Sequence, residues 1–78
     1  MRIFYTEHFN RAFVRLDRPF QLRALKLMDK IRAVPEIGKP MRNARKGTRE
    51  VYLPPFRISY SYAEDVLTFL DVYHKDEQ

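Results

Sequence analysis

The chain has no cysteine, and it has only two glycines among its 78 residues. Without cysteine it can form neither disulfide bonds nor thiolate metal sites, and nothing indicates an oxidising compartment. The two glycines, Gly38 and Gly47, are too few for a phosphate-binding glycine-rich loop. Two histidines, His8 and His74, do not make a metal site without cysteine. We therefore expect no metal and no other cofactor.

Long apolar runs are also missing. No segment is long enough and apolar enough to be a signal peptide or a membrane span. We therefore expect a cytoplasmic protein with no membrane partner. The length allows one domain, which we assign to residues 1–78. A domain this small buries only about 60% of the surface that its unfolded chain exposes, so its core must be efficient or be completed by a partner.

Positive charge is what the chain has in excess. It carries 15 lysines and arginines against 10 acidic residues, which gives a net charge of +5. Such a balance favours binding to RNA, to DNA or to an acidic protein segment. The charge is concentrated in the middle, because residues 42–49 hold four cations and no acid. From Glu64 onward, by contrast, five acids face a single lysine, Lys75.

The N-terminal half predicts one strand and two helices. Residues 2–5 are aromatic and β-branched, as in a short strand, and Thr6 is a good helix N-cap. Apolar residues then recur at helical spacing over residues 9–16 and again over residues 20–34. Asp17 and the proline two residues later separate these two helices. A break this short predicts an antiparallel helical hairpin packed on something flat.

The C-terminal half changes to a period of two. Residues 37–47 predict a basic loop, residues 50–53 alternate, and two prolines follow. Residues 56–62 alternate between apolar and polar, residues 63–65 form a turn, and residues 66–73 form the last strand. We therefore predict an α+β fold with an N-terminal strand, a two-helix hairpin and a three-stranded antiparallel meander, whose one face the helices cover.

Four short segments carry a resemblance to a known family. They are Pro35–Pro40 after the second helix, Lys46–Val51 at the start of the next strand, Phe56–Tyr60 in the strand after it, and Val72–Asp76 at the end of the last strand. In order and spacing these segments resemble those of the RelE/ParE toxins of type II toxin–antitoxin systems, most of all the RelE branch. The resemblance covers the C-terminal half, while the helical half matches in pattern only.

The resemblance implies a function. RelE-type toxins cleave mRNA in the ribosomal decoding site, ParE-type toxins inhibit DNA gyrase, and both are neutralised by an antitoxin. The chain is thus expected to be a metal-independent endoribonuclease that cuts ribosome-bound mRNA and inhibits translation. Its partners would be a cognate antitoxin, the ribosome with its mRNA, and operator DNA only as the toxin–antitoxin complex. Two alternatives stay open: a ParE-like gyrase inhibitor, and a member with a degraded site that still binds antitoxin.

Four residues are candidates for the chemistry. Cleavage through the 2′-OH needs a base, cations for the charge on the phosphate, and an acid for the leaving oxygen. Arg57 matches the family's strand arginine, and a guanidinium forks onto two phosphate oxygens. His74 and Lys75 match the basic end of the last strand, and a hairpin turn at residues 64–65 brings them close to Arg57. Glu50 is a possible base, although Arg57 could instead pair with Glu50 or Asp71 across the sheet.

A second set of residues is suited to binding RNA. The cations of the loop fit a phosphate backbone, although an ordinary solvated loop is the alternative. Tyr52 and Tyr73 could stack on a splayed base, or they could be half-buried sheet residues. Glu50 and Tyr52 also depart from the family, which commonly has basic residues in that strand. The predicted RNA-binding residues are Lys39, Arg42, Arg45, Lys46, Arg49 and Tyr52.

Overall fold

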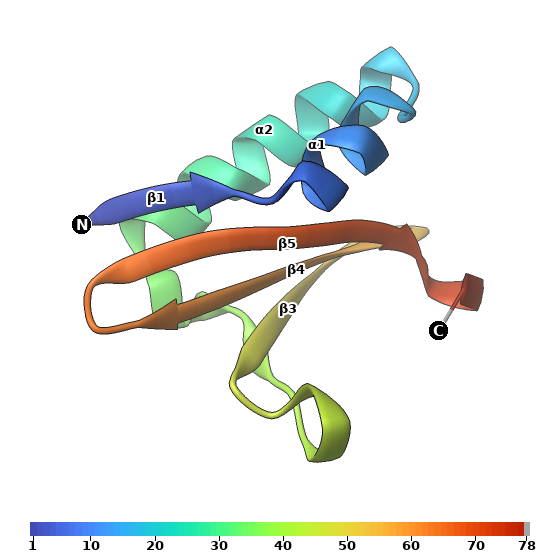
Figure 1. Ribbon diagram of the computed structural model, residues 1–78. Helices are drawn as coiled ribbons and strands as arrows, with labels where there is room; N and C mark the ends of the chain where they lie inside the picture. The colour runs from blue at the N-terminus through green and yellow to red at the C-terminus, as the bar shows by residue number, and fades with distance from the viewer. Residues whose placement is uncertain (78) are drawn as a thin grey trace.

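The fold begins with a strand, continues with two helices and ends in a run of strands (Figure 1). A computed structural model describes residues 1–77. The helices are α1 (Glu7–Val14) and α2 (Arg18–Ala33). The strands are β1 (Arg2–Tyr5), β2 (Lys39–Pro40), β3 (Thr48–Leu53), β4 (Phe56–Ala63) and β5 (Val66–His74). Three short 3-10 turns are η1 (Pro35–Ile37), η2 (Asn43–Arg45) and η3 (Lys75–Glu77).

The five strands form one sheet in the order β1-β5-β4-β3-β2. Strands β3, β4 and β5 form the predicted antiparallel meander, while β1 lies parallel to β5 at one edge. Both helices lie on the same face of the sheet, so the predicted α+β class is confirmed (Figure 1). One strand was not predicted: β2 pairs two residues of the expected loop with β3. Neither described helix has the length and apolar character needed to cross a membrane.

Local chemistry explains where the elements begin and turn. The Thr6 hydroxyl accepts a hydrogen bond from the N–H of Phe9 at 3.0 Å, which caps α1 as predicted. The same hydroxyl donates to the carbonyl of Leu70 at 2.9 Å and so fastens the start of α1 to β5. Glu64 and Asp65 have φ of 53° and 63°. Two left-handed residues in a two-residue loop make a turn that matches the twist of a hairpin.

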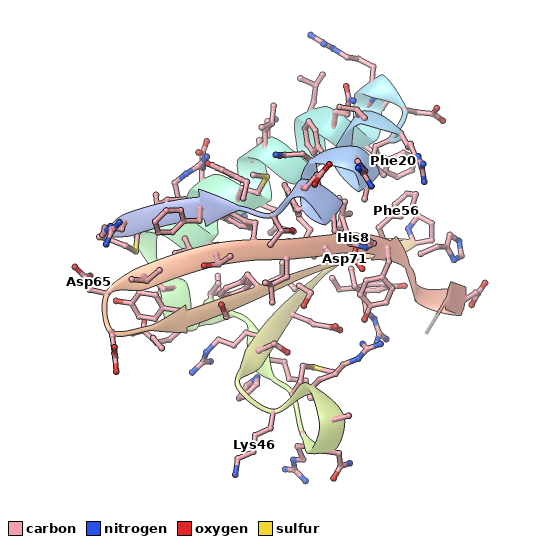
Figure 2. The ribbon with its side chains drawn as sticks, viewed as in Figure 1. His8, Phe20, Lys46, Phe56, Asp65 and Asp71 are labelled. Atoms are coloured by element: carbon pink, nitrogen blue, oxygen red, sulfur yellow. The ribbon has the colours of Figure 1, made fainter. Side chains whose placement is uncertain are left out.

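The core lies between the helices and the covered face of the sheet. Alternation along β4 turns Ile58 and Tyr60 toward the helices, and both are fully buried. A bulge in β5 opposite Ser59 and Tyr60 then keeps Phe69 and Val72 on that same covered face. The Phe56 ring meets the Phe20 ring of α2 edge-on at 5.1 Å, as Figure 2 shows. The residues buried to 3% exposure or less are Phe9, Ala24, Met28, Ile31, Ile58, Tyr60, Leu67 and Phe69.

A buried tyrosine fixes the loop after α2. The Tyr60 hydroxyl accepts a hydrogen bond from the N–H of Gly38 at 2.8 Å and donates one to the carbonyl of Pro35 at 2.7 Å. Burial raises the pKa of Tyr60 above its usual value. A Cβ on Gly38 would lie 2.5 Å from this hydroxyl, so only glycine fits. The loop therefore holds η1 and β2 at a set place beside β3.

Candidate functional site

The uncovered face of the sheet carries the polar side chains of the three long strands. Alternation places Glu50 and Tyr52 on this face in β3, Arg57 in β4 and Tyr73 in β5. In the observed register Arg57 lies between Tyr52 and Tyr73, its partners on the two neighbouring strands. The turn predicted at residues 64–65 thus brings the end of β5 next to Arg57, as expected. These residues are neighbours in space although they span 24 positions in sequence.

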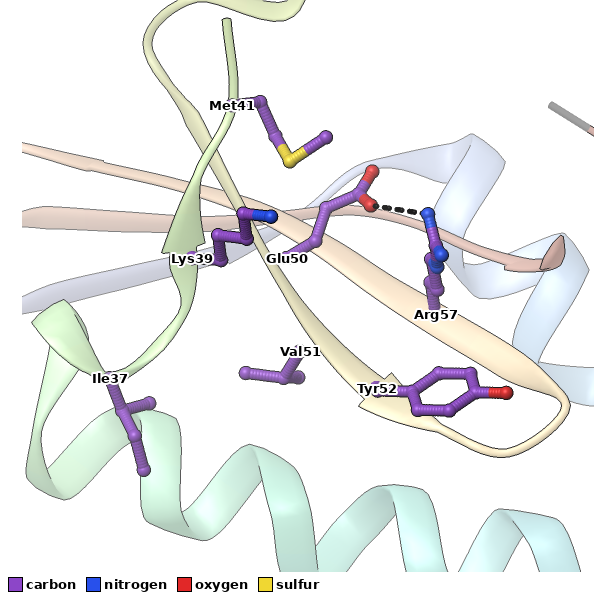
Figure 3. Close-up of a pocket in the computed structure, with 7 residues that line it drawn as sticks. All are labelled: Ile37, Lys39, Met41, Glu50, Val51, Tyr52 and Arg57. Carbon is purple, nitrogen blue, oxygen red and sulfur yellow. Dashed lines mark ion pairs between the residues drawn. The ribbon is translucent and has the colours of Figure 1, made fainter.

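Glu50 is the centre of this face. Its side chain is only 6% exposed, although no helix covers it. The Tyr73 hydroxyl donates to its Oε2 at 2.6 Å, and Nη1 of Arg45 donates to the same oxygen at 3.1 Å. Nη1 of Arg57 lies 3.9 Å from its other oxygen, as the dashed line in Figure 3 marks. A buried carboxylate thus has two guanidinium groups and a hydroxyl around it.

Arg45 reaches this cluster from the loop before β3. The η2 turn folds back toward the uncovered face, where Nη1 of Arg45 also donates to the Tyr73 hydroxyl at 2.7 Å. The Arg45 guanidinium lies 5.3 Å from the centre of the Tyr73 ring. Its hydrogen bond with Tyr73 raises the pKa of Arg45, while burial and then the hydrogen bond to Glu50 raise the pKa of Tyr73. Near neutral pH the arginine stays charged and the tyrosine stays protonated.

Arg57 is held more loosely than Arg45. Its guanidinium lies 5.9 Å from the centre of the Tyr52 ring, and its side chain is 34% exposed. The pairing with Glu50 that we considered as an alternative is therefore present, but it leaves the guanidinium accessible. An anion on this face can bind Arg57 without first displacing a short hydrogen bond, because 3.9 Å is beyond hydrogen-bond length.

Two cavities flank Glu50. One has a volume of about 470 Å³ and the other about 360 Å³. Figure 3 shows the larger one, in which Glu50 and Arg57 point toward each other with Lys39 and Met41 next to Glu50. The larger cavity is lined by Ile37, Lys39, Met41, Glu50, Val51, Tyr52 and Arg57. The smaller one is lined by Ala44, Arg45, Thr48, Glu50, Ser59, Asp71 and Tyr73.

His74 does not share this face with Arg57. Its ring meets the edge of Phe56 at 5.7 Å, and Phe56 packs against α2, so His74 lies on the helix side of the sheet. Its Nδ1 accepts a hydrogen bond from the N–H of Asp76 at 3.2 Å. Lys75 lies in η3, where its N–H donates to the carbonyl of Pro55. Strand alternation therefore separates His74 from Arg57, although the two are close in the register.

The predicted RNA-binding cations lie in three places: beside Glu50, on the helix side of the sheet, or exposed in the loop. Arg45 belongs to the Glu50 cluster, and Lys39 lines the larger cavity. The Arg49 guanidinium lies on the helix side and donates to the carbonyls of Glu36 at 3.0 Å and Gly38 at 2.9 Å. Arg42 and Lys46 are exposed, and Figure 2 shows Lys46 pointing away from the sheet.

Tyr73 is the residue of this site whose role was not predicted. From the sequence it was considered only for stacking, whereas its hydroxyl joins Arg45 to Glu50. The signal was present in the alternation, since Tyr73 lies opposite Arg57 and on the same face as Glu50. The partnership with Arg45 had no such signal, because it depends on how a loop folds back.

The arrangement suits the chemistry of a phosphodiester. A carboxylate can take a proton from an alcohol, and a guanidinium beside it can hold the phosphate whose charge grows as the alcohol attacks. The hydroxyl of Tyr73 and the guanidinium of Arg45 fix the orientation of Glu50. Arg57 is the guanidinium of this group that makes no short hydrogen bond to Glu50.

Comparison with known proteins gives structural likeness without sequence likeness. No family model matches the chain, and no curated protein matches it. A RelBE toxin–antitoxin complex from Mycobacterium tuberculosis is similar with a TM-score of 0.83 at 19% identity, over 95% of this chain and 90% of that one. The intact Escherichia coli RelBE complex has a TM-score of 0.79 at 13% identity, over 94% of both chains. Escherichia coli YafQ has a TM-score of 0.75 at 18% identity, over 99% and 97%.

The likeness extends over almost the whole chain and includes the helical half. Because the sequence identities are below 20%, this structural likeness establishes the fold alone. The chain has the fold of the RelE-like toxins, and the resemblance found in its C-terminal segments is confirmed at that level. The same strands that define this fold carry Glu50, Arg57 and Tyr73 on their uncovered face.

Proposed function

We propose that this chain, which has the RelE-like toxin fold, is the toxin of a toxin–antitoxin pair and cleaves mRNA on the ribosome. The observation that supports this most is the pair of Glu50 and Arg57 on the uncovered face, with Nη1 and Oε1 3.9 Å apart beside an open cavity. Ribosomes place such a protein in the cytoplasm. The reaction needs no metal, because the base and the cations are side chains.

The proposed reaction proceeds through the 2′-OH of the substrate. Glu50 accepts the proton of this hydroxyl, and O2′ attacks the neighbouring phosphorus. The bond from phosphorus to O5′ breaks, which leaves a 2′,3′-cyclic phosphate and a 5′-hydroxyl whose oxygen takes a proton from water. Arg57 binds the phosphate oxygens, where negative charge grows in the transition state.

The remaining polar residues position these groups or the substrate. Tyr73 and Arg45 hold one carboxylate oxygen of Glu50, which leaves the oxygen that faces Arg57 as the proton acceptor. Lys39, Arg42 and Lys46 contribute contacts to neighbouring phosphates, which add affinity without sequence preference. His74 and Lys75 lie at the same end of the β4–β5 hairpin as Arg57, and there they contact the ribosomal RNA.

An antitoxin is the proposed partner. The helix side of the fold exposes apolar residues, among them Tyr5 at 42%, Leu22 at 48% and Leu25 at 43%. A cavity of about 240 Å³ between β1 and the two helices is apolar, and Arg32 lines its rim. An acidic amphipathic segment fits such a surface. Both RelBE structures that this chain resembles are complexes of a toxin with an antitoxin. Operator DNA would be bound by the pair.

One observation favours a second function, that of an antitoxin-binding protein without catalysis. Glu50 already engages both Arg45 and Arg57, so a phosphate must compete with a carboxylate for these cations. In that case the chain would retain its partner surface and bind RNA weakly.

A cleavage assay on translating ribosomes separates these functions. We expect the wild-type chain to cut mRNA, and Arg57→Ala to lower the cleavage rate about 100-fold to 1000-fold, the usual cost of one transition-state donor. Glu50→Gln should lower it similarly. The matched control is Arg11→Ala, an arginine of α1 with 68% exposure, which should cut as the wild type does.

The opposite results are equally clear. Intact mRNA with a folded wild-type chain would reject the nuclease and leave the antitoxin-binding function. Inhibition of gyrase supercoiling without RNA cleavage would instead select a ParE-like activity. As a nuclease or as a gyrase inhibitor, the chain should arrest growth when it is expressed. Coexpression with a small acidic protein encoded next to this chain should abolish that arrest.

A further inference from the structure

We propose that the larger cavity beside β3 is a nucleobase site, in which one base of a single-stranded RNA stacks on Tyr52 and bonds to the backbone edge of β3. The inference rests on the proposed function only for the identity of the ligand as RNA. In this proposal, Tyr52 and the edge of β3 contact the base of the same nucleotide whose phosphate Arg57 binds.

The lining of the cavity is apolar at one end and charged at the other. Tyr52 is 53% exposed and Ile37 is 49% exposed, which is unusual for apolar side chains next to a buried carboxylate. Glu50, Arg57 and Lys39 line the charged end. A nucleotide has the matching composition, because its base is flat and apolar on its faces while its phosphate is anionic.

The backbone of β3 offers hydrogen bonds at this place. Strand β2 pairs only with Arg49 and Glu50, so among residues 1–77 no strand lies beside β3 on this side from Val51 onward, while β4 pairs with its other side. The N–H of Met41 donates to the carbonyl of Thr48 at 2.9 Å, which shows that the Thr48 backbone faces the β2 side. Backbone groups alternate along a strand, so those of Tyr52 face the same side. One N–H and one C=O of Tyr52 therefore point to the cavity edge.

The position of Arg57 links this base to the reacting phosphate. Its guanidinium lies 5.9 Å from the centre of the Tyr52 ring and 3.9 Å from Glu50. A phosphate bound by Arg57 thus has Tyr52 within one nucleotide of it. In Figure 3, the Tyr52 ring lies beside Arg57.

A protein strand added to the same edge is the rival occupant. The free part of β3 is short, since Leu53 is its last residue and two prolines follow. Only the backbone groups of every second residue face outward, which leaves too few for a ladder. A base needs only one donor and one acceptor, so the geometry favours RNA.

The test uses the full chain and an RNA that cannot react. A tetranucleotide with 2′-O-methyl groups has no free nucleophile, and 2-aminopurine in it loses fluorescence when it stacks. We expect quenching by the wild type and by Tyr52→Phe, with affinities within about 2-fold because the ring is kept. Tyr52→Ala should weaken binding about 5-fold to 100-fold and remove the quenching, as expected when one base no longer stacks on an aromatic ring. Phe4→Ala, an exposed aromatic of β1, is the matched control and should bind as the wild type does.

An abasic version of the same oligonucleotide completes the test. It should bind the wild type as weakly as the complete oligonucleotide binds Tyr52→Ala. Equal binding of both oligonucleotides by the wild type and Tyr52→Ala would overturn the base site, even if the wild type cleaves mRNA. Loss of antitoxin binding in Tyr52→Ala with unchanged oligonucleotide binding would overturn it too. A chain that shows the base effect but never cleaves mRNA would keep this inference and reject only the nuclease.

Discussion

The two faces of the sheet are made by the same strands and are buried by different means. On the covered face Val72 is 5% exposed because helices pack over it, whereas on the uncovered face Glu50 is 7% exposed with no helix above it. The residues that bury Glu50 are themselves polar: Arg45 from a loop and Tyr73 from β5. One face therefore buries apolar area, and the other buries a charge.

This difference separates stability from function. Burial of apolar surface contributes about 25 cal/mol for each Å². A buried carboxylate with its cations gains little by comparison, because the cost of removing the charges from water offsets their attraction. The uncovered face thus adds little to folding and keeps Glu50 and Arg57 oriented for a ligand. Substitutions on the two faces should have different consequences.

The largest difference is expected for two neighbours in β4. Ile58 points into the core with 0% exposure, while Ser59 faces the smaller cavity. Ile58→Ala should lower the free energy of unfolding by about 2–5 kcal/mol, since it removes buried methylene groups and leaves a cavity. Ser59→Ala should lower it by less than about 1 kcal/mol. Urea denaturation followed by circular dichroism measures both.

Equal losses in the two variants would contradict the comparison, because they would make the uncovered face part of the core. Ile58→Ala should also cleave mRNA on ribosomes at a rate little changed from the wild type, when the assay is run well below the unfolding temperature of the variant.

A smaller effect is expected from the two buried tyrosines, one on each face. Burial raises the pKa of both Tyr60 and Tyr73 above the ordinary value of 10.0. A group whose pKa is higher in the folded state stabilises the fold below its unfolded pKa, and this contribution is lost as the pH rises through the folded pKa. The free energy of unfolding should therefore be constant near neutral pH and fall above about pH 10.

Phenylalanine at either position removes the titrating group. Tyr60→Phe should flatten the alkaline decline more than Tyr73→Phe, because Tyr60 is fully buried and Tyr73 is half-buried. At neutral pH each variant should lose about 1 kcal/mol for its missing hydrogen bonds. Urea denaturation between pH 8 and about pH 11 tests this. An equal slope in wild type and Tyr60→Phe would show that the covered face does not hold this hydroxyl in its neutral form.

The covered face could be predicted from the sequence because its signals are local. Thr6 begins α1 through its own hydroxyl, and the period of two in β4 assigns Ile58 and Tyr60 to the core. The order of strands and helices followed from such periods. The two-residue turn at Glu64 and Asp65 predicted Arg57 opposite residue 72 or 73, and the bulge in β5 places it opposite Tyr73.

The uncovered face was predicted only in part because its contacts are long-range. Arg45 and Tyr73 are 28 residues apart, and no local pattern pairs them. The bulge in β5 leaves Leu70 without an opposite residue, so the alternation of side chains shifts by one residue at that point. The face of a residue near the end of β5 is therefore found by counting back from the C-terminal end of the strand. Counted that way, it places His74 with Val72 on the helix side, away from Arg57.

The smallest effect is expected for the cations of residues 42–49, which lie on different sides of the sheet. Arg42 and Lys46 are exposed on the uncovered side, whereas Arg49 bonds to the carbonyls of Glu36 and Gly38 on the helix side. Replacing both Arg42 and Lys46 with alanine should lower the slope of log affinity against log salt for single-stranded RNA, by about 0.7 for each phosphate that the variant no longer neutralises. Oligonucleotide titrations in a series of sodium chloride concentrations measure this slope.

Arg49→Ala is the matched control, since it removes one cation from the same segment. It should leave the slope unchanged and lower the free energy of unfolding by about 1–2 kcal/mol, because two carbonyls lose a charged donor. A slope that falls as much in Arg49→Ala would show that this guanidinium leaves its carbonyls to bind RNA. The division between a stabilising face and a binding face would then fail at the one arginine that lies at their border.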